Sequence, residues 1–486
     1  MSKRYTISSI MWIAFLIIVY LGIQIGLALL FKKAACPAWE SLIPIYREYR
    51  ITKLTGRPIW WLLLLFVPIV NLLVGISLYL DFVRCFGKRS FFDQVGAVAI
   101  PFVLFPLWGA DTRINYLGQS ATETFKAQYP HKKTILREWA DALVFAVVAA
   151  TIIRTFFIEA YAIPSGSMER SLMTGDFLFV SKIHYGPRLP ITPLAFPFAH
   201  NTLPLIDTKS YWDGVQLPYY RLPGFQSIAH NEAVVFNYPM DADAPLNRPV
   251  DKRDNYIKRA VGLPGDTLSI VDAQIYVNGK QQAAPVQGQL LYEVLTDGTD
   301  INPERINDLR IEGGATGEPN HYVFYLTPSL AKVIRGWTNV KEVDPLILPK
   351  GTPEPMDDIF PKGYPAVWNR DQYGPIVIPK KGWSVHLNKK TASLYKRAIT
   401  VYEGNTLEEK SDGYYINGKK TSDYRFAMDY YWMMGDNRHN SLDSRYWGFV
   451  PEDHIVGKPL FVWLSWDEKG TLLDKIRWNR LFMPIQ

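Results

Sequence analysis

Long apolar runs are confined to the first third of the chain. Residues 10–31 form a stretch of 22 residues without a charge, and weaker runs cover residues 58–80 and 95–109. A fourth run, residues 139–158, has charged residues only toward its two ends. A helix of about 20 apolar residues is long enough to cross the hydrocarbon core of a bilayer. The pattern therefore predicts several membrane helices before residue 160.

Basic residues between these runs predict the orientation. Residues 32–57 and 110–138 each contain at least five Lys or Arg, and basic loops of membrane proteins tend to remain in the cytoplasm. The short stretch 81–94 is also basic, which conflicts with four simple spans, whereas a re-entrant segment over residues 58–109 removes the conflict. Both arrangements place residues 160–486 outside.

The pattern changes after residue 160. Short stretches of β-branched and aromatic residues alternate with Pro, Gly and Asn turns. The clearest are residues 177–182, 233–238, 267–271 and 376–378. Two further segments, QIYVNGK and GYYINGK, place Asn-Gly where a two-residue hairpin needs it. Strands at this spacing predict a mostly β domain.

Composition and residue spacing exclude several classes of protein and of binding site. The net charge is +7 over 486 residues, which is too mild to indicate a nucleic-acid binder. The two cysteines exclude a disulfide scaffold and a Cys-rich metal site. The eight histidines show no metal-ligand spacing, and no Gly-rich phosphate loop is present. We therefore expect no metal and no cofactor.

Three external segments carry candidate chemistry: AIPSGSMERSLMTGD at 162–176, YIKRAVGLPGD at 256–266, and GDNRHNSLDSRYWGFVPE at 435–452. Taken singly, each suits a turn, a surface strand or a hydrogen-bonded loop. Lys258 lies in a strand-like run, with Ile257 and Arg259 on the opposite face. Burial would lower the pKa of such a lysine and allow it to act as a general base.

The three segments, in this order and after a predicted membrane helix, resemble the signature segments of type I signal peptidases. The resemblance runs from about residue 138 to residue 466. It implies a Ser–Lys dyad, with Ser167 as nucleophile and Lys258 as general base. It also assigns Ser165 to the oxyanion hole, together with the backbone N–H of Ser167.

The resemblance implies further supporting roles. Ser441 matches the serine that orients the lysine, and Asp443 and Arg445 match a structural ion pair, with Arg259 in the same neighbourhood. The substrate would bind as an added strand, and shallow pockets would admit only small residues on either side of one variable position. The residues expected to line this groove are Ile163, Pro164, Tyr256 and Ile257.

The resemblance also implies the architecture. We expect amino-terminal transmembrane helices followed by a mostly β external catalytic domain with a large β-rich insert. The implied partners are signal peptides of preproteins and the lipid bilayer, and the implied location is a bacterial inner membrane with a periplasmic catalytic domain.

Met168, Leu172, Phe177 and Phe179 could rest on lipid, although the last two also suit a core. The expected divisions are a membrane region at 1–137, a transmembrane helix at 138–159, a catalytic core at 160–266 and 435–486, and an inserted subdomain at 267–434.

Several alternatives stay open. His439 could serve as a base with Ser167 and Asp443, but a lysine base leaves it no role. The chain could be a non-catalytic relative that holds signal peptides, a different Ser–Lys protease such as a self-cleaving repressor, or a transporter. Loss of activity in Ser167→Ala would exclude a transporter, and loss in Lys258→Ala would exclude the histidine triad.

Overall fold

The computed structural model divides the chain into two compact units, Met1–Phe145 and Ala146–Gln486. The residues it describes are 2–65, 70–130, 135–203, 206–355, 359–362, 367–467, 470 and 475–485. Each unit is described by itself below.

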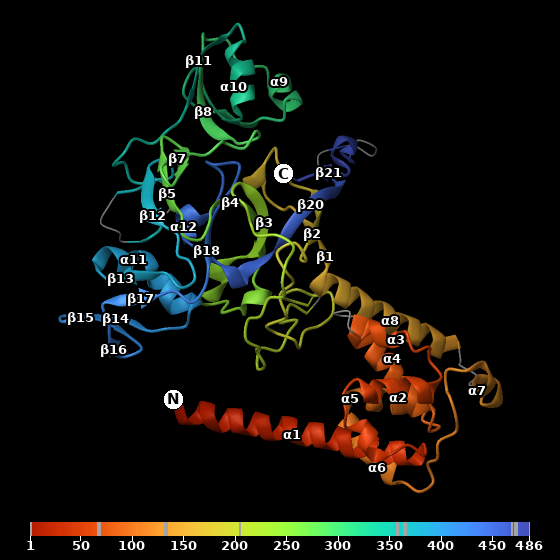
Figure 1. Ribbon diagram of the computed structural model, residues 1–486. Coiled ribbons are helices and arrows are strands. Elements are labelled where there is room, and N and C mark those ends of the chain that lie inside the picture. The colour runs from red at the N-terminus through yellow and green to blue at the C-terminus, as the bar shows by residue number, and fades with distance from the viewer. Residues whose placement is uncertain are drawn as a thin grey trace. The chain divides into compact units, whose positions relative to one another are not determined.

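The first unit is helical. Its interior is an apolar cluster that includes Leu27, Phe31, Phe82 and Phe105. The helices, visible in Figure 1, are α1 (Ser2–Lys33), α2 (Tyr46–Thr55), α3 (Trp61–Leu64), α4 (Val70–Arg84), α5 (Phe91–Ala99), α6 (Pro101–Ala110), α7 (Glu123–Gln128) and the first part of α8 (Ile135–Phe156).

The four apolar runs fall on helices, with one interruption and one break. The run at 58–80 includes residues 66–69, which lie outside the described residues. The run at 95–109 breaks between α5 and α6, whose axes differ by 119°, because Pro101 cannot continue the hydrogen-bond ladder of the preceding helix. Among the described residues, no single helix is both long and apolar enough to cross a membrane, although α5 and α6 together meet that test. The number of spans stays a prediction.

The second unit is mostly β, as the sequence predicted. Its main sheet has the strand order β1, β2, β20, β3, β4, β18, β19, with β21 beside β20. Neighbouring strands are antiparallel, and apolar clusters on Leu178, Val235 and Val462 and on Phe236 and Trp447 form its core. These strands are β1 (Ile158–Ala162), β2 (Asp176–Ser181), β3 (Glu232–Asn237), β4 (Asn255–Gly262), β18 (Tyr430–Met434), β19 (Val450–Pro451), β20 (Ile455–Ser465) and β21 (Met483–Pro484).

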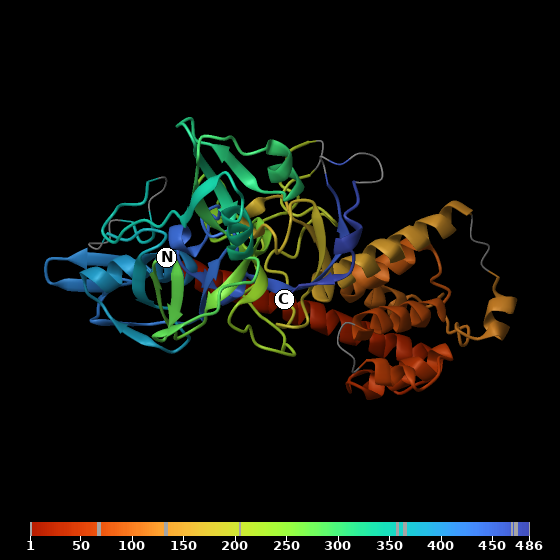
Figure 2. The same ribbon diagram turned by 90° about the horizontal axis from the view of Figure 1, so that it is seen from above.

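Smaller sheets occupy residues 267–425. Both Asn-Gly pairs form the predicted two-residue turns, with positive φ at Asn278, Gly279, Asn417 and Gly418. In Figures 1 and 2 the sheet of β8–β11 projects from the rest of the unit together with α9 and α10. The strands are β5 (Thr267–Val271), β6 (Gln274–Val277), β7 (Lys280–Gln281), β8 (Leu290–Thr296), β9 (Glu312–Ala315), β10 (His321–Leu326), β11 (Val340–Pro345), β12 (Tyr373–Val377), β13 (Ser384–His386), β14 (Leu407–Lys410), β15 (Gly413–Ile416), β16 (Lys419–Lys420) and β17 (Asp423–Arg425).

Four helices of this unit were not predicted. They are short, between four and nine residues, so their apolar periodicity is too brief to recognise in the sequence. They are α9 (Pro303–Asp308), α10 (Pro328–Arg335), α11 (Lys389–Arg397) and α12 (Ser444–Trp447).

Candidate active site

The segment that carries Ser167 is a short 3-10 turn, Gly166–Met168, directly after the edge strand β1. Two backbone hydrogen bonds of Ile163 fix its start: the Ile163 N–H donates to the Asp176 carbonyl oxygen over 2.8 Å, and the Gly175 N–H donates to the Ile163 carbonyl oxygen over 2.9 Å. Met168 fixes its end, because this side chain is 1% exposed and packs in the core. The hydroxyl of Ser167 is thus presented from a rigid turn.

Lys258 faces this hydroxyl from β4. Its Nζ lies 2.6 Å from Ser167 Oγ and also donates to the Ile257 carbonyl oxygen over 3.1 Å. Lys258 is 3% exposed. Burial lowers its pKa from 10.5 to about 8, against the opposing effect of Asp443 and Asp436. A lysine with this pKa is neutral in a useful fraction near neutral pH and can accept a proton from the serine.

A cavity of about 370 Å³ opens beside this pair. One wall is formed by residues 161–168 and the other by residues 255–258, with Leu178 and Val235 between them. The four predicted groove residues, Ile163, Pro164, Tyr256 and Ile257, all line it, as do Ser165 and both members of the pair.

Both walls of the cavity include a strand edge without a second neighbour. β1 is the last described strand of the sheet on its side. Among the described strands, β4 pairs with β18 only from Arg259 onward, so residues 255–258 pair with β3 alone. Two strand edges next to one cavity can accept an extended peptide through main-chain hydrogen bonds.

Asp443 and Arg445 form the predicted ion pair. The Arg445 guanidinium donates to both carboxylate oxygens over 2.9 and 2.8 Å, and both residues are at most 1% exposed. Burial alone would raise the pKa of Asp443, but Arg445 holds it below its usual range. Arg445 also donates to the Arg438 carbonyl oxygen over 2.5 Å and thereby ties the third segment together.

Arg259 has a partner that the sequence did not reveal. Its guanidinium donates to both oxygens of Asp436 over 2.8 and 2.6 Å, and Ser171 Oγ donates to the same carboxylate over 2.6 Å. Asp436 lies in the third segment, so this pair joins it to β4. The GD dipeptide was visible in the sequence, but spacing alone could not distinguish it from an ordinary turn.

Asn437 is a second residue that sequence reasoning missed. Its backbone N–H donates to the Ser167 carbonyl oxygen over 3.1 Å, and its Nδ2 donates to the Gly166 carbonyl oxygen over 3.2 Å. The third segment therefore holds the nucleophile turn directly. Gly435 is required in this contact, because a Cβ there would lie 2.5 Å from the Ser167 carbonyl oxygen.

The two supporting serines are in the same region. Ser165 lines the cavity at its exposed end. Ser441 is 7% exposed, and its Oγ makes no hydrogen bond with the described part of the chain. The Lys258 ammonium bonds Ser167 and Ile257 in this structure, so the orienting role of Ser441 stays a prediction.

His439 has other partners than the nucleophile. Its Nδ1 accepts from the Leu291 N–H over 3.1 Å, and its Nε2 lies 2.7 Å from the buried carboxylate of Asp371. Nε2 must carry the proton, because Nδ1 faces a donor. Both ring nitrogens are thus engaged in a structural contact, which disfavours a triad with Ser167.

Among the residues that the structure describes, no group of three or more His, Cys, Asp or Glu side chains could hold a metal ion. The site described above contains a hydroxyl, an amine and two carboxylate–guanidinium pairs.

Two protein families match parts of this chain, and one of the matches includes the site. Residues 136–313 and 422–466 match the family described as signal peptidase, peptidase S26, and residues 39–119 match a family of unknown function. The first match continues into residues 267–313, which lie within the predicted insert, so the insert and its boundaries stay a prediction.

Relatives named Signal peptidase I match much of the chain. That of Buchnera aphidicola subsp. Baizongia pistaciae is 25% identical over 376 residues, which are 76% of this chain and 86% of the relative. That of Pseudomonas aeruginosa is 25% identical over 349 residues, covering 70% and 76% respectively. That of Rickettsia massiliae is 23% identical over 369 residues, covering 73% and 94%. The matched family segments contain Ser167, Lys258 and the whole run from Gly435 to Ser465. The chain is therefore similar to the type I signal peptidases of the peptidase S26 family, and these matches support a serine peptidase.

Proposed function

We propose that this chain removes amino-terminal signal peptides from exported preproteins by a Ser–Lys mechanism and cuts after small-x-small sites. The observation that carries the proposal is the 2.6 Å contact between Lys258 Nζ and Ser167 Oγ in a site where the lysine is 3% exposed. The relatives named Signal peptidase I support the substrate class.

In the acylation step, neutral Lys258 Nζ accepts the proton of the Ser167 hydroxyl while Oγ bonds to the scissile carbonyl carbon. A serine hydroxyl is a weak nucleophile without such a base. The tetrahedral oxyanion is bound by the hydroxyl of Ser165 and the N–H of Ser167; one such donor is worth about 3 kcal/mol. The carbon–nitrogen bond then breaks, and the lysine ammonium gives its proton to the leaving amine.

Deacylation repeats the sequence with water. Lys258 takes a proton from a water molecule that attacks the acyl carbon, and it returns this proton to Ser167 Oγ as the ester bond breaks. Ser441 would orient the amine, and the Asp443–Arg445 and Arg259–Asp436 pairs would hold the surrounding segments. No metal or cofactor takes part in this proposal.

The signal peptide would enter the cavity as an extended strand between Ile163 and Pro164 on one wall and Tyr256 and Ile257 on the other. By the resemblance, these side chains would leave shallow pockets that admit only small residues at two positions. We propose a chain anchored by several passages through a bacterial inner membrane, with this cavity on the periplasmic side.

Cleavage of a preprotein by the purified, detergent-solubilised full chain tests the proposal. We expect the parent to release the mature protein after a small-x-small site, and Ser167→Ala and Lys258→Ala to be inactive. Lys280→Ala is a matched control, because this lysine is exposed on β7. Cleavage by Lys258→Ala would exclude the lysine base, and an inactive parent would favour a protein that holds signal peptides without cutting them.

A further inference from the structure

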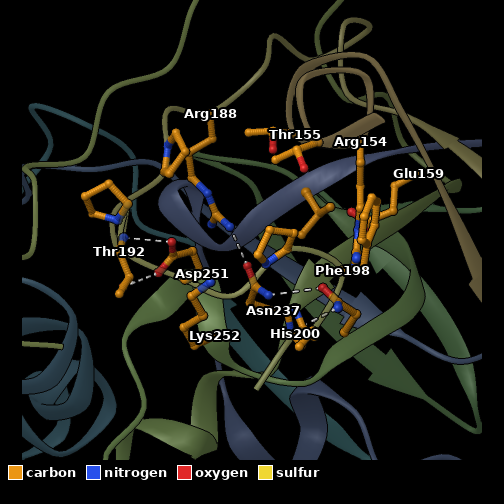
Figure 3. Close-up of a pocket in the computed structure, with 18 of the residues that line it drawn as sticks. Arg154, Thr155, Glu159, Arg188, Thr192, Phe198, His200, Asn237, Asp251 and Lys252 are labelled. Carbon is orange, nitrogen blue, oxygen red and sulfur yellow. Dashed lines mark hydrogen bonds and ion pairs between the residues drawn. The ribbon is translucent and has the colours of Figure 1, made fainter. Parts of the chain in front are cut away.

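A second cavity, of about 240 Å³, adjoins the first and shares Tyr161 and Asn255 with it. It is lined by the end of α8, by the start of β1 and by the irregular segment between β2 and β3 (Figure 3). The mechanism proposed above uses none of its charged side chains.

The acidic groups of this cavity already have partners. Glu159 accepts from Arg154 over 2.5 Å and forms an ion pair of 2.8 Å with Lys182. Asp251 accepts from the N–H and the hydroxyl of Thr192, each over 2.8 Å. In Figure 3, Arg154 and Glu159 lie on one side of the cavity, and Asp251 and Lys252 lie on the other.

Lys252 is a cation of this cavity that forms no ion pair or hydrogen bond with the described part of the chain, although Asp251 and Glu159 act on it electrostatically. It is 9% exposed, and its ammonium lies over the ring of Tyr211, 5.6 Å from the centroid. Burial lowers the pKa of Lys252, against the weaker opposing effect of Asp251. A desolvated ammonium group is strongly stabilised by an anion that enters beside it.

The rim of the cavity belongs to a segment with many exposed apolar side chains, which we call the apolar loop (residues 186–203 and 206–225). Phe196 and Phe198 line the cavity and are 63% and 54% exposed. Other members with at least 45% exposure are Leu194, Ile206, Trp212, Leu217, Tyr220 and Phe225. Exposed apolar clusters of this kind mark surfaces that contact a partner or a membrane, and Trp and Tyr favour the membrane–water interface.

The sequence predicts a lipid-facing surface elsewhere, at Met168, Leu172, Phe177 and Phe179. Met168 and Leu172, two of the residues suggested for it, are each 1% exposed and belong to the core, so that suggestion was wrong for them. Phe177 and Phe179 are half-buried and pack against Trp463. The apolar loop offers a more exposed surface, and it is the one that borders a buried cation.

We propose that the apolar loop rests on the bilayer surface and that the adjoining cavity binds the phosphate of an anionic phospholipid, with Lys252 as its ion-pair partner. The occupant must combine one anionic group for Lys252 with apolar chains that cover Phe196 and Phe198, and a phospholipid has both. The inference rests on the proposed function only in that a signal peptidase works at a membrane surface.

Native mass spectrometry of the intact, detergent-solubilised chain tests this inference without using cleavage. The chain is titrated with dioctanoyl phosphatidylglycerol, dioctanoyl phosphatidylcholine and sn-glycerol 3-phosphate. We expect the anionic lipid to bind at least about tenfold more tightly than the zwitterionic lipid. Both carry the phosphate, but the choline group of the latter brings a further cation into a cavity that is already lined by Lys252, Lys182 and Arg154. Glycerol 3-phosphate has the anion without acyl chains and is expected to bind much more weakly.

Variants locate the site. Lys252→Gln is expected to abolish the preference for phosphatidylglycerol, Lys252→Arg to keep it, and Lys280→Gln to leave it unchanged as an exposed control. Phe196→Ser with Phe198→Ser is expected to weaken both lipids. The proposal is overturned if Lys252→Gln keeps the preference, or if glycerol 3-phosphate binds as tightly as the lipid, which would indicate a site for free anions.

A parallel cleavage assay separates this proposal from the proposed function. If the parent cuts preproteins and lipid binding ignores Lys252, only the lipid site is wrong. If Lys252→Gln instead changes kcat/KM only for substrates with an acidic residue before the cleavage site, the cavity belongs to the substrate groove. Lipid selectivity without any cleavage would support the lipid site and contradict the peptidase function.

Discussion

The pH dependence of cleavage tests the central feature of the site, which is a lysine that is neutral when it acts. A pKa of about 8 for Lys258 means that about 1% of the side chain is neutral at pH 6 and about 90% at pH 9. Only the neutral amine can accept the Ser167 proton, so kcat/KM should rise about tenfold per pH unit below pH 7. It should level off above pH 8.5, with a total gain near 90-fold between pH 6 and pH 9.

The assay uses the full chain in detergent and an acetylated peptide substrate without ionisable side chains near the scissile bond. The profile of kcat/KM then reports groups of the free enzyme. Ser167→Ala gives the background at each pH. A profile that is flat from pH 6 to pH 9 would refute the neutral-lysine argument. A midpoint near 10.5, the ordinary pKa of a lysine, would show that burial does not perturb this amine.

Three further results follow from the same contacts. Lys258→Met should raise the free energy of unfolding by about 3 kcal/mol at pH 7. The folded-state pKa of about 8 lies below 10.5, so burial of the protonated amine opposes folding at this pH. In thermal unfolding scans, the gain in stability should disappear as the pH rises toward 10.5. Gly435→Ala should lower kcat about 100-fold or more, because its Cβ would lie 2.5 Å from the Ser167 carbonyl oxygen. His439→Ala should lose about 1–3 kcal/mol in chemical denaturation, since buried Asp371 loses a donor, yet keep most of its activity per folded molecule; full inactivation there would revive the triad.

Much of the second unit could be predicted because its elements are specified locally. The Asn-Gly turns required positive φ at both central residues, and the structure has them at both hairpins. The strands at 177–182 and 233–238 carry apolar residues that bury against the opposite strands, and the structure places β2 and β3 within one residue of those bounds. The short helices could not be predicted, because one or two turns give no clear periodicity.

The site could be predicted only in part, because distinctive local segments identify some of its residues but not the contacts between distant ones. Ser167 and Lys258 lie in distinctive segments, and the structure brings them within 2.6 Å. The partner of Arg259 is 177 residues away, and sequence spacing carries no information about such a contact. Lys252 was not predicted, because its burial and its lack of an ion pair among the described residues arise only when distant segments fold around it.

The two ion pairs explain how Lys258 stays easy to deprotonate although two carboxylates act on it. Asp443 and Asp436 each raise its pKa, and a free carboxylate nearby would keep the amine protonated. Each carboxylate is instead held by two hydrogen bonds from its own guanidinium, Arg445 or Arg259, so its effect on the amine is weaker than that of a free carboxylate. Desolvation can then dominate, and the lysine remains a base. Removing either guanidinium would leave an uncompensated carboxylate beside the amine, so the pH profile of that variant should move to higher pH even where the fold survives.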